Sequence, residues 1–113
     1  MSMNIHISAT REAMVIKTGE TFTQTIRFDC WQTPTKVSYQ IIENENPLEA
    51  YKEWAIDRKD VGTFLIYEEG DFFKEREPIG ESIVNYSEDH VNELNEWIEM
   101  CAECDYDIKV EVY

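Results

Sequence analysis

The side chains best suited to chemistry in this sequence are its three cysteines and its many carboxylates. Cys101 and Cys104 have the CxxC spacing that redox and zinc sites use. They fall at the C-terminal end of a predicted helix, beside Glu103 and Asp105, where the helix dipole and the carboxylates both disfavour a thiolate. We therefore predict buried structural thiols, with no cofactor and no bound metal.

A zinc site is the alternative interpretation of these thiols. Such a site takes four ligands, and Cys30, His6 and His90 are the residues left to complete it. His90 falls close to the edge of the apolar face of the same predicted helix, so a contribution from its imidazole stays open.

Paired carboxylates could also serve a glycosidase or a magnesium-dependent nuclease. With 24 Asp and Glu among 113 residues, however, close pairs arise by chance. The chain has four glycines, no glycine-rich phosphate loop, and no Ser or Cys nucleophile at an informative spacing from a His. The sequence therefore predicts a protein that is not an enzyme.

The formal net charge of −14 is extreme for 113 residues and is unevenly distributed. Residues 1–42 hold three acidic and four basic side chains, whereas residues 43–113 hold 21 acidic and six basic ones. Such a field repels nucleic acid and anionic membranes and attracts basic surfaces. An odd number of cysteines, with no secretory signal and no long apolar run, favours a reducing cytoplasm and predicts no membrane-spanning segment.

A long amphipathic helix near the C-terminus is predicted to position most of these groups. Ser87 is its expected N-cap. At 100° per residue the apolar side chains fall in one arc of about 160°. This arc holds Val91, Leu94, Trp97, Ile98, Cys101, Ala102 and Cys104. The other side holds Glu88, Asp89, Glu93, Glu96, Glu99 and Glu103. One face should therefore pack on a sheet while the other displays carboxylates.

The first part of the chain predicts an antiparallel β-meander. Alternating apolar residues predict strands over residues 3–9, 13–17 and 21–28, the last two joined by a tight turn at Thr18-Gly19. The threonines of the third strand should face solvent, whereas Gln24 interrupts its apolar side without an evident reason.

Two shorter helices should follow this meander. Thr33-Pro34 can serve as N-cap and first residue of a helix to Glu43, although residues 36–42 also alternate as a strand would. Asn46-Pro47 is a stronger start, because Asn46 can cap the helix and a Glu follows three residues later. This second helix should end near Arg58 and bury Tyr51 and Ala55 among other residues.

Strands should complete the fold. The apolar run Val61–Tyr67 predicts a buried strand, residues 82–86 predict another, and Ile108–Val112 alternates as a half-buried strand does. Residues 68–80 predict an acidic loop that contains Phe72-Phe73. The whole chain is thus expected to form one α+β domain, with the C-terminal helix packed on the sheet.

The acidic surface is the remaining candidate for function. Six carboxylates span about 25 Å of the C-terminal helix, which is sparse beside the one charge per about 1.7 Å of duplex DNA. Acidic residues of the preceding helix and of the acidic loop would make the density comparable if all shared one surface. The predicted partner-binding residues are Glu49, Glu53, Glu68, Glu69, Asp71, Phe72, Asp89, Glu93, Glu96, Glu99 and Glu103.

In its size, its charge and its acidic segment from residue 43 onward, the chain resembles the small acidic proteins that bacteriophages and mobile elements make against host defence. Such anti-restriction and anti-CRISPR proteins often block nucleic-acid-binding surfaces by presenting carboxylates where phosphates would lie. The resemblance implies a phage-type DNA mimic in the cytoplasm of a bacterial host. A shorter likeness, over Val15–Phe22, is to the opening strands of some phage tail and baseplate modules.

We therefore expect a non-enzymatic inhibitor whose partner is a basic nucleic-acid-binding protein, with no direct binding of nucleic acid or membrane. The alternative is a structural or adaptor module of a virion or host complex, in which the acidity serves solubility. Clustering of the acids on one surface favours the first hypothesis, and even scattering favours the second. The sequence leaves the oligomeric state open, a homodimer included.

Overall fold

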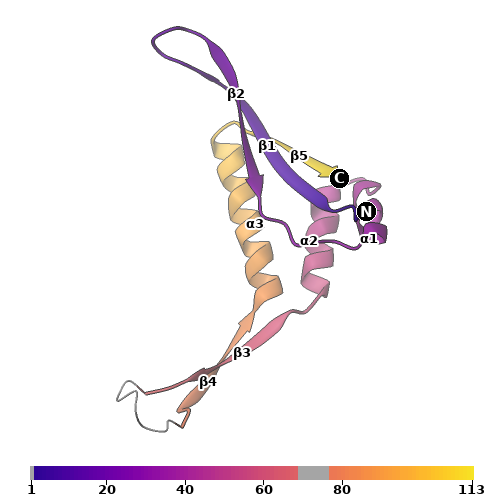
Figure 1. Ribbon diagram of the computed structural model, residues 1–113, viewed down its shortest axis with the longest axis vertical. Helices are drawn as coiled ribbons and strands as arrows, with labels where there is room; N and C mark the ends of the chain where they lie inside the picture. Colours follow the sequence, from indigo (N-terminus) through magenta and orange to yellow (C-terminus); the bar gives the residue numbers. More distant parts are fainter. Residues whose placement is uncertain (1, 69–76) are drawn as a thin grey trace.

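The fold was analysed in a computed structural model, which describes residues 2–68 and 77–113. Its helices and strands form two antiparallel sheets and three helices, an α+β architecture (Figure 1). In chain order the elements are β1 (Ile5–Met14), β2 (Thr21–Phe28), α1 (Thr35–Ile42), α2 (Pro47–Asp57), β3 (Val61–Ile66), β4 (Gly80–Asn85), α3 (Tyr86–Glu103) and β5 (Asp107–Val112).

The larger sheet has the strand order β2-β1-β5, so the N-terminal strand lies in its middle. β1 pairs with β2 from Ile7 opposite Phe28 to Met14 opposite Thr21. Its other edge pairs with β5 from Ile5 opposite Val112. The third strand of the sheet is therefore the last strand of the chain, and not a third strand of an N-terminal meander.

The predicted break between strands 3–9 and 13–17 is wrong, because β1 is one strand of ten residues. Arg11, in the middle of the predicted break, has long-range partners that hold it in the strand. Its Nε donates to Gln24 Oε1 at 2.7 Å, another guanidinium nitrogen donates to the Cys104 carbonyl at 3.1 Å, and its guanidinium lies over the Tyr106 ring. The same contact explains the polar Gln24 on the apolar side of β2. The tight turn is confirmed, since the Gly19 N–H donates to the Val15 carbonyl and Gly19 has a φ of 71°.

The hydrophobic core lies between one face of this sheet and the helices. Ile5 and Ile7 of β1 pack with Ile41 of α1, Tyr51 of α2 and Leu94 of α3, and all five are buried. α2 and α3 lie side by side across this face (Figure 1). The opposite face carries polar side chains, and the predicted solvent exposure of the threonines of β2 is confirmed.

α1 and α2 are helices as predicted, so the alternative of a strand over residues 36–42 is excluded. Asn46 caps α2 by accepting a hydrogen bond from the Glu49 N–H at 3.3 Å. The predicted capping role of Thr33 is wrong. Thr33 is buried, its hydroxyl accepts a hydrogen bond from the Ile5 N–H, and Pro34 stands at the N-cap position of α1 without a side-chain hydrogen bond. Thr33 thus ties the segment before α1 to the central strand.

α3 runs from Tyr86 to Glu103, and its predicted core positions Leu94 and Cys101 are fully buried. Ala102, however, is exposed although it falls in the apolar arc. The predicted cap is also wrong, because Asn85 accepts the hydrogen bond from the Glu88 N–H. Ser87 is instead buried and accepts a hydrogen bond from the Asp60 N–H at 2.9 Å, which joins the end of α2 to the start of α3.

β3 and β4 form a two-stranded ribbon that projects from the rest of the molecule (Figure 1). The prediction of a strand over Val61–Tyr67 is confirmed, but the prediction that it is buried is wrong. Val61, Phe64 and Leu65 are about half exposed, because few residues of the body pack against the ribbon.

The molecule is correspondingly elongated. Its radius of gyration is 20.1 Å, whereas a compact domain of this length would have about 13 Å. The β1–β2 hairpin and the β3–β4 ribbon extend in opposite directions from the body, so the long axis measures 63 Å (Figure 1). Among the residues described, no helix is both long and apolar enough to cross a membrane.

Candidate functional site

The outward faces of α2 and α3 carry a continuous set of carboxylates, which we call the acidic layer. Every member is exposed to solvent. The layer consists of Glu49, Glu53 and Asp57 on α2 and Glu88, Asp89, Glu93, Glu96, Glu99 and Glu103 on α3. α2 and α3 pack against each other, so the carboxylates lie on two neighbouring helices.

A groove of about 490 Å³ runs between the two helices. Glu49, Glu53 and Asp57 line its α2 side, while Val91 and Asn95 line its α3 side. Lys52 is the one basic residue in the lining, and its Nζ is paired with Glu49 Oε1 at 2.8 Å. The groove is thus an acidic depression with a small apolar floor.

The outward face of the sheet has a different charge balance. Its basic side chains are Arg27 and Lys109, and its acidic ones are Glu12, Asp107 and Glu111, with threonines between them. α3, in contrast, has six carboxylates and no Lys or Arg. The acidic layer thus holds nine of the 24 carboxylates of the chain, with Lys52 as the one basic side chain of the two helices.

With the carboxylates of α2 added, the charge density of the layer is nearer to that of a nucleic acid than the charge density of α3 alone. α3 has 18 residues and is about 27 Å long. Its six carboxylates and the three of α2 give about one charge per 3 Å along this length. Duplex DNA has one per about 1.7 Å. One strand of a duplex, with a charge per about 3.4 Å, is the closer match.

Seven of the predicted partner-binding residues thus lie together in the acidic layer. Glu68 does not belong to it, since it follows β3 at the outer end of the ribbon. The predicted residues Glu69, Asp71 and Phe72 lie outside the described part of the chain.

A second cluster of chemically capable side chains lies inside the molecule, around His90. The Tyr51 hydroxyl is 2.7 Å from His90 Nε2 and accepts a hydrogen bond from the Trp31 N–H at 2.9 Å. The Trp31 ring stacks on the imidazole with 4.1 Å between centroids, and the Arg58 guanidinium lies over the same indole. Trp31 is therefore half-buried, in contact with His90 and Arg58.

The ionisation of this cluster favours a neutral pair. Burial lowers the pKa of His90, although the nearby charges of Glu93 and Asp29 act in the opposite direction. Burial is also the main cause that raises the pKa of Tyr51. The Tyr51 hydroxyl, which accepts from the Trp31 N–H, also shares a hydrogen bond with His90 Nε2, and the tautomer of the neutral imidazole sets which of the two atoms donates. The cluster is a polar contact that joins α2, α3 and the segment after β2.

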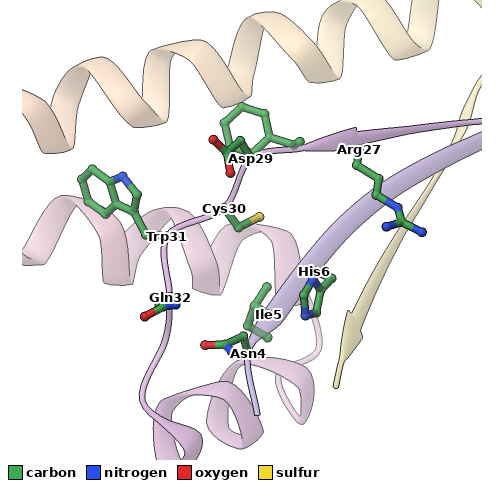
Figure 2. Close-up of a pocket in the computed structure, with 9 residues that line it drawn as sticks. Asn4, Ile5, His6, Arg27, Asp29, Cys30, Trp31 and Gln32 are labelled. Carbon is green, nitrogen blue, oxygen red and sulfur yellow. The ribbon is translucent and has the colours of Figure 1, made fainter. Parts of the chain in front are cut away.

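A cavity of about 410 Å³ lies next to this cluster, at the end of β2 (Figure 2). Its lining includes His6, Arg27, Asp29 and Cys30. Burial raises the pKa of the Cys30 thiol to about 11, so the group stays protonated near neutral pH. His6 is held by stacking on Tyr113, with ring centroids 3.7 Å apart. These groups therefore do not form an activated nucleophile with its base.

The two cysteines of the CxxC pair have unequal surroundings. Cys101 is fully buried, and burial raises the pKa of its thiol. Cys104 is half-buried at the end of α3, and its carbonyl accepts the hydrogen bond from Arg11. In the residues described, no group of three or more His, Cys, Asp and Glu is arranged to hold a metal ion.

Sequence patterns missed two features. The sequence places His90 near the edge of the apolar face of α3, yet its side chain is buried and only 7 % exposed. Trp31 and Phe28, which lie far from His90 in the sequence, cover its ring. The exposed ribbon was also missed, since an apolar run predicts a strand but not what will cover it. No family model, curated protein or solved structure matches this chain.

Proposed function

We propose that this chain is a non-enzymatic binding protein that inhibits a basic nucleic-acid-binding protein by presenting its acidic layer where phosphates would lie. The observation that supports the proposal is the separation of charge between the helices and the sheet: α2 and α3, which pack together, carry nine exposed carboxylates and one Lys, whereas the outward face of the sheet is nearly balanced. Acidity that served solubility alone would need no such separation. The resemblance to phage anti-defence proteins makes a bacterial host's restriction or CRISPR effector the class of partner to test first.

The physical basis of binding would be long-range attraction to a basic surface. A field of this strength steers association and raises the on-rate, and dissolved salt weakens it. The Debye length falls from about 10 Å at 0.1 M salt to about 3 Å at 1 M. The on-rate should therefore fall steeply over this range, while a contact dominated by apolar burial would change little.

A competition experiment tests the proposal. Purified restriction and CRISPR effectors, each bound to a short labelled duplex or guide, would be titrated with the chain while fluorescence anisotropy is recorded. We expect release of the nucleic acid by at least one effector, with an apparent affinity that falls as salt rises. A partner that binds the chain and its nucleic acid at the same time, with little effect of salt, would contradict the mimic.

The second candidate function is an adaptor or structural module. One observation favours it, namely the exposed apolar side chains of the β3–β4 ribbon, such as Ile83, which is 73 % exposed. An adaptor that binds through this ribbon would keep its partner after the charges of the acidic layer are reversed. A mimic would lose its partner, so the same charge reversals separate the two functions.

A further inference from the structure

The β3–β4 ribbon presents an apolar surface that the body of the molecule does not cover. Val61 is 54 % exposed, Leu65 is 49 % exposed and Ile83 is 73 % exposed. Tyr67 and Ile79 continue the two strands and are 43 % and 65 % exposed. Isolated two-stranded hairpins are marginally stable in water, and exposed apolar patches of this kind mark interaction sites.

The two faces of the ribbon differ in their surroundings. On one face, the Tyr86 ring lies so close to Gly62 that a Cβ there would be 2.6 Å from it, and Phe64 packs edge-on against the same ring. On the other face, Ile83 stands opposite Thr63, with Val61 and Leu65 as its diagonal neighbours. We call this second face the uncovered face. It is formed by Val61, Thr63, Leu65, Glu81, Ile83 and Asn85, with Tyr67 and Ile79 beyond them, and its one carboxylate, Glu81, stands opposite Leu65.

The amount of apolar surface is enough for a stable dimer. Five large apolar or aromatic side chains of the uncovered face are between 43 % and 73 % exposed, namely Val61, Leu65, Tyr67, Ile79 and Ile83. At about 150–250 Å² for each aromatic side chain and somewhat less for the aliphatic ones, they leave on the order of 500 Å² of apolar surface per copy. A standard specific interface buries about 800 Å² on each partner, and about 65 % of a homodimer interface is apolar, which is about the same apolar area.

The distribution of charge along the ribbon fits a second copy of the same chain. Among the residues of β3 and β4, Glu81 is the one charged side chain, and it lies towards the outer end of the uncovered face, so most of the net charge of −14 lies outside the ribbon strands. Arg58, Lys59 and Asp60 precede β3 at the base and have a net charge of +1, whereas Glu68, Glu77 and Glu81 lie at the outer end. An antiparallel pair would set each acidic end over the partner's basic one.

The length of the ribbon also keeps the two acidic bodies apart. Six residues of strand extend about 20 Å. This separation exceeds the Debye length of about 8 Å at physiological salt, so the repulsion between the two acidic layers would be largely screened.

We propose that the uncovered face of the ribbon binds the same face of a second copy across a two-fold axis, giving a four-stranded, two-layer β interface. Ile83 lies near the centre of this interface. The inference does not rest on the proposed function, because it concerns a different surface and requires no other protein. Both acidic layers stay exposed in such a dimer.

Sedimentation equilibrium over a wide concentration series tests the dimer with two matched variants. Ile83→Glu places a charge at the centre of the interface, and Ile16→Glu makes the same change at a residue that is 95 % exposed in the β1–β2 turn. We expect wild type and Ile16→Glu to have twice the chain mass of 13.4 kDa. Ile83→Glu should weaken dimerisation by about 100-fold or more, since central interface residues carry most of the binding energy and each dimer loses two of them.

Three results would overturn the proposal. They are a wild-type chain that stays monomeric throughout the series, equal behaviour of the two variants, and a dimer that persists in Ile83→Glu. Circular dichroism tests whether each variant is folded. If Ile83→Glu is unfolded, Leu65→Lys on the same face replaces it in the experiment, and the same weakening of dimerisation is expected. A monomeric wild type that still competes with nucleic acid would contradict the dimer but would leave the proposed function of the acidic layer standing.

Discussion

His90 is a buried side chain that can titrate near neutral pH, so its charge state links the stability of the fold to pH. Tyr51, Trp31 and Phe28 pack around its ring. The pKa of His90 is lowered from its ordinary value of 6.5 in the folded chain by burial. Between the two pKa values the unfolded chain binds more protons than the folded chain, so stability must rise with pH across that interval.

The first prediction follows from this sign. The His90 contribution is fully present above about pH 6.5 and is lost as the pH falls through the lower pKa of the folded state. His90→Gln removes the titrating group and keeps a neutral polar side chain. Urea unfolding at pH 7 and pH 5 should show a larger loss of stability on acidification in wild type than in the variant. Equal losses would mean that His90 does not titrate differently in the two states.

The second prediction concerns the CxxC pair. Replacement of Cys101 and Cys104 by Ala should lower the free energy of unfolding by about 1–2 kcal/mol, because it leaves a small cavity at the buried Cys101 position. The affinity for a nucleic-acid-binding partner should not change. The metal content of purified wild type provides the check, since stoichiometric zinc that is lost in the double variant would show that the thiols are ligands.

Among the elements, α3 connects the core to the acidic layer. Leu94 is fully buried against Ile5 and Ile7 of β1, and Trp97 packs against Phe28 of β2 with ring centroids 5.9 Å apart. The opposite side of the same helix displays six carboxylates. The packing of one face therefore sets the position of the charges on the other.

The third prediction tests this packing. Leu94→Ala should lower the free energy of unfolding by about 2–5 kcal/mol, since it removes a fully buried side chain and leaves a cavity. Asn95→Ala, at the exposed neighbouring position, should change it by less than about 0.5 kcal/mol. A thermal midpoint that is equally unaffected in both variants would show that α3 docks through another face.

The same elements show how much of this fold the sequence could predict. The caps at Asn46 and the arc around Leu94 were predictable, because capping and helical periodicity depend on residues within a few positions. The unbroken β1 was not, since its middle is held by Arg11 contacts to Gln24 and to the Cys104 carbonyl, which lie far along the chain. For the site, the carboxylates of α3 were predictable one by one. Their grouping with those of α2 depends on how two helices pack.

The whole molecule has two surfaces suited to different interactions. The acidic layer would act at long range through charge, whereas the β3–β4 ribbon would act at short range through apolar burial. They lie on different elements, and a change to one leaves the residues of the other in place. A dimer formed through the ribbons would carry two acidic layers and could bind two partners or one symmetric partner.

The central claim is that the position of the negative charge, and not its amount, produces inhibition. Asp89→Lys, Glu93→Lys and Glu96→Lys together reverse three exposed charges of α3. Glu12→Lys, Glu20→Lys and Asp107→Lys change the net charge by the same amount on exposed positions of the β1–β2 hairpin and β5. Both triple variants should stay folded, because all six side chains are exposed.

The deciding measurement is the release of labelled nucleic acid from a responsive effector, recorded with wild type and both triple variants at the same salt concentration. We predict that the α3 variant loses inhibition, whereas the hairpin and β5 variant retains most of it. An equal loss of inhibition in both variants would show that inhibition depends on the net charge and not on the position of the charges. Full inhibition by the α3 variant would contradict the role of the acidic layer.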